Sequence, residues 1–322
     1  MKFRQLEYYV QIVESGSMAQ AARRLHVVQP ALSQQLASLE YEIGKKLLTR
    51  SSKGVTMTSN GAALYQHAKF VLRQMEQAAK IARADAGDIA GVVAIGLVPS
   101  TIAAVGLELV SEFRVKFPGI TLKIVEALGG QLDQLLQTNQ IDFTVRFTSA
   151  TTKGFESSFL LEEELFVLVS GDSQLVLPKR ASITLSEAAE LPLILTTTSH
   201  GLRPLITREM ERKGLTIAPV IESDSLALLI ECVASNLGAT ILPMSALQFE
   251  RAGKPLRAIR ISGEKITRKN YLCSQSEDRL SACALLAREE LRQLITRLAR
   301  SGQWRGVTLP NELDVSGSEA LL

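Results

Sequence analysis

Three short runs with apolar residues spaced three and four positions apart open the chain, and each predicts a helix. The first ends at Gly16, the second follows Ser17, which can cap its N-terminus, and the third starts near Pro30 and ends at Gly44. The positions expected to be buried in the third helix are Leu32, Leu36, Leu39 and Ile43. Three helices with a tight second connection predict a helix-turn-helix unit.

The exposed side of the third helix carries polar groups that can hydrogen-bond to base edges, with no acidic residue near its start. The candidate DNA contacts on this helix are Gln29, Ser33 and Gln34. The segment Leu47–Thr58 alternates apolar and polar residues around Gly54, which predicts a small hairpin wing, and its Arg50 and Lys53 can contact phosphates. A polar helix face can also be merely solvated, and trihelical units also serve as protein-interaction modules.

A long amphipathic helix is predicted from about Ser59 to Ala86, because its apolar positions step by four and three throughout. The positions predicted to form a dimerisation seam are Leu64, Ala68, Val71, Met75 and Ala78. Such a stripe needs something to cover it, and a second copy of the chain is the natural partner. The alternative is packing against the helix's own domain.

From Val92 onward, short apolar strands alternate with amphipathic helices, which predicts a parallel α/β fold in two lobes with a ligand cleft between them. The expected strands are Val92–Leu97, Thr121–Glu126, Ile141–Phe147, Glu164–Val169, Leu193–Thr196, Thr216–Glu222 and Ala239–Leu242. The expected helices are Ile102–Phe117, Leu132–Thr138, Leu202–Lys213 and Ser225–Asn236.

Turns rich in hydroxyl groups and glycine follow several of these strands. Free N–H groups at helix starts, joined by hydroxyls, can hold a carboxylate or another anion, and the competing interpretation is ordinary helix capping. The candidate ligand contacts are Ser100, Thr101, Gly129, Gly130, Thr197 and Ser199. Arg146 could pair with an anionic ligand or simply cap its strand, and the sequence leaves both open.

Charge and composition narrow the class of protein. Residues 1–87 hold twelve Lys/Arg and six Asp/Glu, a balance of +6, whereas the remainder holds 24 and 27, a balance of −3. A basic module joined to a slightly acidic one is typical of nucleic-acid binding. Three cysteines without CxxC spacing suggest neither disulfides nor zinc, and with no secretory signal pattern we expect a cytoplasmic protein. The uncharged run Ile89–Leu107 contains turn residues and favours a strand, a turn and a helix start over a membrane span.

No catalytic signature of the serine hydrolase, zinc protease, P-loop or dinucleotide-binding kind occurs, so we expect no enzyme, metal or cofactor. The N-terminal motifs instead resemble those of LysR-type transcription regulators. The runs that carry the resemblance are Gly16-Ser17-Met18-Ala19-Gln20-Ala21-Ala22, Gln29-Pro30-Ala31-Leu32-Ser33-Gln34-Gln35-Leu36, Leu39-Glu40, Leu47-Leu48-Thr49-Arg50 and, more loosely, Ile241-Leu242-Pro243. Within that family, the N-terminal third is most similar to the nitrogen assimilation control regulators.

The resemblance implies a winged helix-turn-helix in residues 1–58, a dimerisation linker helix in 59–88 and a periplasmic-binding-protein-like effector domain in 89–300. Lobe I of that domain would hold about 89–160 and 267–300, lobe II about 161–266, and 301–322 would form a tail. It implies double-stranded DNA, a small-molecule effector, further copies of the chain as a dimer or tetramer, and RNA polymerase as partners. It places Gln29, Pro30 and Ser33 as recognition-helix contacts, Arg50 as the wing contact, and Ser100, Thr101, Thr197 and Ser199 at the effector. The alternatives are a regulator that needs no effector and a cytosolic solute-binding α/β protein with a helical interaction module.

Overall fold

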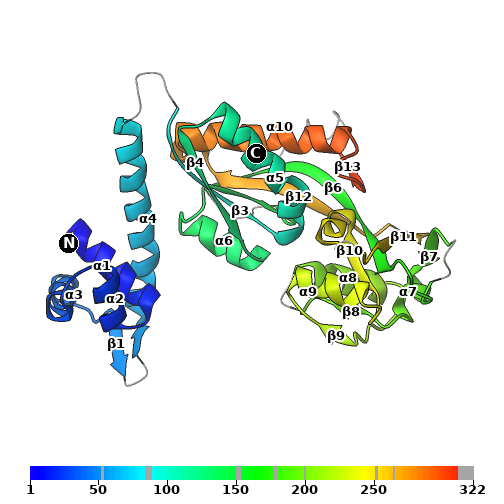
Figure 1. Cartoon of the computed structure of the whole chain (residues 1–322), viewed down its shortest axis with the longest axis horizontal. Coiled ribbons are helices and arrows are strands. Elements are labelled where there is room, and N and C mark those ends of the chain that lie inside the picture. Colours follow the sequence, from blue (N-terminus) through cyan, green and yellow to red (C-terminus); the bar gives the residue numbers. More distant parts are fainter. Residues whose placement is uncertain are drawn as a thin grey trace. The chain divides into compact units, whose positions relative to one another are not determined.

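The structure is a computed structural model that describes residues 1–51, 54–83, 89–149, 154–176, 180–198, 201–250, 253–263 and 265–310 (Figure 1). The chain divides into two compact units, one of residues 1–92 with 137–140 and the other of residues 93–136 and 141–322. No helix among the described residues is both long and apolar enough to cross a bilayer.

The N-terminal unit is a small helical domain with a hairpin and a long final helix. Its elements are α1 (Phe3–Ser15), α2 (Met18–Arg24), α3 (Gln29–Ile43), β1 (Leu48–Ser51), β2 (Gly54–Met57) and α4 (Ser59–Arg83). The predicted ends are confirmed: Gly16 and Gly44 end their helices in the left-handed conformation, and the Ser17 hydroxyl accepts a hydrogen bond from the backbone N–H of Gln20.

The core of this unit contains the predicted Leu32, Leu36 and Leu39 of α3, together with Tyr9 and Ile12 of α1. The predicted burial of Ile43 is wrong, because this last helical residue is 38% exposed. Glu40 is buried instead, since its carboxylate accepts hydrogen bonds from the chain that follows α3.

The second unit contains a nine-stranded mixed sheet and a separate two-stranded sheet within the described residues. Its first elements are β3 (Gly91–Leu97), α5 (Pro99–Lys116), β4 (Ile120–Glu126), α6 (Gly129–Gln137), β5 (Phe143–Arg146) and β6 (Phe155–Ser170). There follow β7 (Ser182–Thr184), α7 (Leu185–Ala189), β8 (Ile194–Leu195), α8 (Leu202–Glu211), β9 (Ile221–Glu222) and α9 (Leu226–Ala234). The last are β10 (Thr240–Pro243), η1 (Met244–Phe249), β11 (Leu256–Ser262), β12 (Thr267–Gln275), η2 (Glu277–Arg279), α10 (Ala282–Arg300) and β13 (Val307–Thr308).

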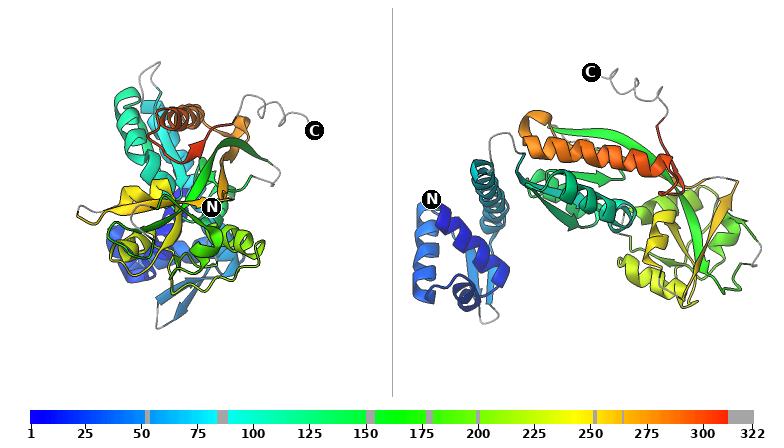
Figure 2. Two further views of the ribbon diagram at one scale, coloured as in Figure 1. Left: turned by 90° about the vertical axis from the view of Figure 1, so that its right-hand side faces the viewer. Right: turned by 45° about the horizontal axis from the view of Figure 1, so that its top comes forward.

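The first lobe has a sheet with helices on both faces. Along β3, Val93 and Ile95 pack with α5 and α10, whereas Ala94 between them packs with α6 on the opposite face. Figure 2 shows α5 and α10 lying along the sheet. This alternation follows from the two-residue period of a strand, and it explains why β3 is apolar throughout.

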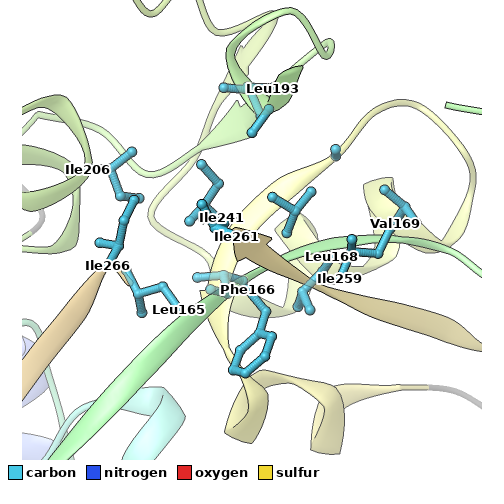
Figure 3. Packing of buried hydrophobic residues seen from close by; sticks show 14 of the residues in the cluster. Leu165, Phe166, Leu168, Val169, Leu193, Ile206, Ile241, Ile259, Ile261 and Ile266 are labelled. Carbon is cyan, nitrogen blue, oxygen red and sulfur yellow. The ribbon is translucent and has the colours of Figure 1, made fainter. Parts of the chain in front are cut away.

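The second lobe is built around the C-terminal half of β6, which pairs antiparallel with both β10 and β11. Its buried cluster takes Leu165 and Val169 from β6, Ile241 from β10 and Ile259 from β11, and α8 adds Ile206 (Figure 3). The sixteen-residue β6 therefore belongs to both lobes, and β12 returns beside it in the antiparallel sense.

Two sequence expectations need correction, and part of the expected tail is ordered on the sheet. The sheet is mixed, not parallel, because β6 and β12 carry the chain out to the second lobe and back as antiparallel neighbours. The expected strand Thr216–Glu222 shrinks to Ile221–Glu222, since Pro219 lacks the N–H that pairing needs. Within the expected tail, Trp304 is 3% exposed and β13 pairs with β6, residues 301–303 are exposed, and 311–322 lie outside the described residues.

Candidate DNA-binding and effector sites

The exposed face of α3 is formed by residues that the sequence singled out. Gln29, Pro30 and Gln34 are exposed and Ser33 is half-buried. Pro30 lies in the first turn of α3, where its missing N–H costs no helical hydrogen bond. No acidic residue lies in that first turn, so nothing negative opposes a phosphate there.

The hairpin of β1 and β2 lies beside this helix and is joined to it by a side-chain contact. Arg50, which pairs with Val55 across the hairpin, donates from Nη2 to Ser33 Oγ at 3.1 Å. The predicted recognition helix and the predicted wing cation are therefore adjacent. Lys53, the other predicted wing contact, lies outside the described residues.

A backbone hydrogen bond and a close backbone approach fix the hairpin on the helices. The backbone N–H of Val55 donates to the carbonyl of Gly16 at 2.9 Å. A Cβ at Gly54 would lie 2.6 Å from that same carbonyl oxygen, and the φ of Gly54 is +119°. Only glycine fits such a close approach in this conformation, so Gly54 sets the position of the wing.

Glu40 on α3 holds the chain that leads into the wing. Its carboxylate accepts from the backbone N–H groups of Leu47 at 2.9 Å and Leu48 at 3.3 Å, and from Lys46 Nζ at 2.7 Å. Burial raises the pKa of the Glu40 carboxyl, but the hydrogen bonds from Lys46, Leu47 and Leu48 outweigh it and lower the pKa overall. From the sequence, Glu40 has no expected role beyond its place in the Leu39-Glu40 motif.

The apolar stripe of α4 has two parts with different surroundings. Leu64 and Ala68 pack against Leu6 and Val10 of α1, so the first part covers its own domain. Farther along, Val71 is 40% exposed, Met75 is 48% exposed, and Ala78 is exposed. The alternative of packing within the domain therefore holds for the first part of the stripe, and only the second part is open to a partner.

Two neighbouring hollows, which share some of their lining residues, lie between the lobes of the second unit. The inner one has a volume of about 20 Å³, room for about one water molecule, and is lined mainly by apolar residues such as Leu202 and Leu242. The outer one has a volume of about 910 Å³ and a polar lining. Leu202, Phe147 and Arg268 line both hollows.

The predicted effector residues divide among these hollows. Ser100 lines the inner one, and Gly129 and Gly130 line the outer one. Thr101 is fully buried and lines neither, and its Oγ1 has no hydrogen-bond partner among the described residues. The structure thus brings three of these residues to the cleft.

The remaining predicted hydroxyls lie after β8. Thr197 lines neither hollow, and both its backbone N–H and its hydroxyl donate to the Asp224 carboxylate, at 3.0 and 2.9 Å. This arrangement is the ordinary use of a threonine to fix a nearby loop. Ser199 lies outside the described residues.

Arg146 binds residues of its own lobe. It pairs with Asp133, and its Nε and Nη2 donate to the carbonyls of Thr148 and Ser149 at 2.8 and 3.1 Å. Burial raises the pKa of Asp133 although Arg146 acts to lower it. Arg146 therefore ties down the loop after β5 and still contributes its positive charge to the outer hollow.

Sequence reasoning missed a buried charge pair beside the cleft. Arg268 on β12 lies opposite Glu163 on β6, and its Nε and Nη2 are 2.8 and 2.7 Å from Glu163 Oε2. The same guanidinium donates to Ser100 Oγ at 2.9 Å and covers the Phe147 ring at 3.8 Å. The sequence offers little signal, because Glu163 lies within a run of three glutamates and Arg268 lies beside a lysine. Charged residues on a strand need partners only if they are buried.

Comparison with known proteins agrees with this architecture. Residues 3–62 match the family model described as bacterial regulatory helix-turn-helix protein, lysR family, and residues 86–296 match the LysR substrate binding domain. The nitrogen assimilation regulatory protein nac of Klebsiella aerogenes is 34% identical over 298 residues, which are 92% of this chain and 96% of that protein. Its Escherichia coli counterpart is 36% identical over 247 residues, 76% of this chain and 79% of that protein.

A solved structure shares the fold over nearly the whole length. Full-length CbnR, crystallised with its target DNA, superposes with a TM-score of 0.71 at 22% identity, covering 92% of this chain and 99% of that one. The two family models account together for most of the sequence, and the order of the two units is that of the family. The chain is therefore a LysR-type transcription regulator, a DNA-binding protein with an effector-binding domain and not an enzyme.

Proposed function

We propose that this regulator reads its operator by placing the exposed face of α3 in the major groove while Arg50 contacts the flanking backbone. In this proposal Gln29, Ser33 and Gln34 face base edges and Pro30 lies against the backbone. The observation that carries it is the Arg50–Ser33 hydrogen bond, because it puts the wing cation beside the polar face of α3. The +6 balance of residues 1–87 supports the same face, and Lys53 is proposed to add to it.

The effector is proposed to be a small molecule with at least one anionic group, bound in the outer hollow. Six cationic residues line it against three acidic ones: Arg146, Arg208, Arg212, Lys265, Arg268 and Lys269 against Asp133, Glu162 and Glu209. This excess of positive charge favours a carboxylate or phosphate as ligand. Gly129 and Gly130 are part of the lining of the same hollow. The inner hollow has a volume of only about 20 Å³ and has Asp224 in its lining, so an anion has less reason to bind there.

Dimerisation is proposed to use the second part of the α4 stripe, Val71, Met75 and Ala78, with Leu64 and Ala68 supporting the helix from within its own unit. A two-fold dimer would place two copies of α3 on successive turns of DNA. Pairing of two dimers into a tetramer and contact with RNA polymerase complete the proposal, which places the protein in the cytoplasm. An effector acts by preferring one arrangement of the lobes, and that preference shifts the equilibrium.

Operator binding is tested with three alanine variants measured on the cognate operator and on random duplex at several salt concentrations. Ser33→Ala and Gln29→Ala are expected to weaken operator binding about tenfold and leave random binding nearly unchanged, as for a lost base contact. Arg50→Ala is expected to weaken both and to flatten the salt dependence. The control is Lys69→Ala, which removes one cation of α4 that pairs with Glu14 of α1. Equal losses on both duplexes for every variant, control included, would refute the assignment.

The effector class is tested by isothermal titration of the full-length protein with small carboxylates, phosphate and neutral sugars as comparators. An anionic effector predicts saturable binding that weakens as salt rises, since the interaction is screened. Binding of neutral compounds alone would remove the anionic class. A regulator that needs no effector would show operator binding and no saturable ligand at all.

A further inference from the structure

The buried pair of Glu163 and Arg268 is the centre of a polar cluster that joins four separate segments of the second unit. Glu163 is 1% exposed, and each of its carboxylate oxygens has two partner residues. Arg268 and Asn270 Nδ2, at 3.2 Å, bond to Oε2. Trp304 Nε1 at 3.1 Å and Ser245 Oγ at 3.4 Å bond to Oε1. A carboxylate buried so deeply is stable only with such a full set of donors.

Arg268 connects this cluster to the effector cleft. Its side chain is 4% exposed, lines both hollows, and rests on the Phe147 ring. Glu163 and Ser100 occupy Nε and Nη2, whereas Nη1 has no hydrogen-bond partner among the described residues. Arg268 is thus held in one orientation with a donor left over on the guanidinium that lines the cleft.

The C-terminal segment supplies the other half of the cluster. The backbone N–H of Trp304 donates to the carbonyl of Leu298 at 3.0 Å, and the carbonyl of Gly306 accepts from Glu164 at 2.8 Å. Val307 then pairs with Glu163 across β13 and β6. Gly306 has a φ of +74°, and a Cβ there would lie 3.0 Å from the Phe166 ring. Residues 304–308 are therefore fitted closely onto the strand that crosses between the lobes.

We propose that Trp304 and Glu163 are positioning residues of the effector cleft, which hold Arg268 so that Nη1 can bind an anionic group of the effector. The C-terminal segment is then part of effector recognition, although it lies outside the region that matches the substrate-binding family model. This inference rests on the anionic effector proposed above. Loss of the indole N–H leaves Oε1 with one donor fewer, and the carboxylate shifts to regain one. Arg268, bonded to the same carboxylate, shifts with it.

The first test measures citrate binding by titration calorimetry, with citrate as a small polyanionic probe. Trp304→Phe keeps an aromatic ring but lacks the N–H, and its Kd is expected to rise about 3- to 10-fold, as for a net hydrogen-bond loss. The matched control is Leu309→Ala, which removes packing of the same segment on the lobe I core and removes none of the hydrogen-bond donors to the Glu163 carboxylate. Equal losses in the two variants would overturn the proposal, since both would then act through the segment's stability.

The second test needs no ligand, because Trp304 is the one tryptophan of the chain. Arg268→Met removes the charge that compensates Glu163, so water is expected to enter and the Trp304 emission maximum to shift to the red. Arg260→Met is the control, since Arg260 pairs with Glu164 on the neighbouring strand and is 59% exposed. An unchanged emission maximum in Arg268→Met would contradict the proposal that Arg268, Glu163 and Trp304 form one cluster.

The two tests separate this inference from the proposed function. Wild-type protein that binds its operator but neither citrate nor any of the small carboxylates and phosphate titrated above would remove the anionic class. The emission shift alone would then decide whether the cluster exists. If wild-type protein and Arg268→Met bind citrate with the same Kd, the anionic effector class still stands, but the proposed role of Arg268 is wrong.

Discussion

Glu40 is expected to be the side chain on which the position of the wing depends most. The substitution Glu40→Ala removes the acceptor of two backbone N–H groups, those of Leu47 and Leu48, which are only 1% and 6% exposed. Leaving a buried donor unpaired costs about 1–3 kcal/mol, so the two together predict a loss of about 3 kcal/mol. Lys46 adds little, because its own side chain is 79% exposed.

Hydrogen–deuterium exchange of the full-length protein measures this loss locally. Peptides covering residues 45–58 are expected to exchange roughly a hundredfold faster in Glu40→Ala, since about 1.4 kcal/mol corresponds to tenfold. The matched control is Lys46→Ala, which removes the exposed half of the same ion pair and is expected to change exchange less than about threefold. Equal protection in Glu40→Ala and Lys46→Ala would refute the reasoning.

The same residue predicts a dependence on pH with a definite sign. The pKa of Glu40 is lower in the folded chain than its ordinary value, so its carboxylate stabilises the wing above the ordinary carboxyl range. That stabilisation is lost as pH falls below about 4–5 and through the folded pKa. Glu40→Gln cannot ionise, so its difference from the wild type should shrink on acidification; a difference that grows instead would contradict the assignment.

Two further predictions concern the remainder of the N-terminal unit. Gly61→Ala is expected to destabilise it by about 3 kcal/mol in urea unfolding, because a Cβ there would lie 2.0 Å from the Leu47 carbonyl oxygen; a loss below about 1 kcal/mol would mean that the backbone moves freely. Met75→Asp is expected to weaken self-association at least tenfold in sedimentation equilibrium, whereas Gln74→Asp, an exposed neighbour, should leave it within about twofold. Similar losses in both would show that charge, and not the apolar stripe, matters.

Local sequence signals were enough to predict the helix ends of the N-terminal unit, because each helix end depends on residues that are close together in the chain. Gly16, Ser17, Pro30 and Gly44 mark helix ends through backbone conformation and capping, and the structure confirms all four. Helical periodicity placed Ile43 in the core, where the structure instead buries Glu40 of the same helix. Periodicity could not show that Glu40 would find partners six to eight residues later.

The effector domain was less predictable, since its determinants are non-local. The direction of β6 and β12 depends on how the chain crosses between lobes, which no short pattern encodes. Thr197 had the residue type expected of an anion-binding turn, but Asp224, 27 residues later, occupies its donors. A hydroxyl-rich turn is thus weak grounds for a ligand contact until its competing acceptors are known.

Glu163 and Arg268 illustrate the opposite case, in which functional importance is inferred from the structure and not from a sequence pattern. Glu163 and Arg268 are separated by 105 residues, and neither follows a motif, yet they form the most deeply buried ion pair among the described residues. Burying two charges is costly enough that packing alone would favour apolar residues at both positions. Their presence at the crossing between the lobes, beside the cleft and bonded to Trp304, is explained most simply if the guanidinium is needed there. Replacing the pair together with Met and Leu tests this directly: folding should survive, as it does for many buried pairs, while effector response should not.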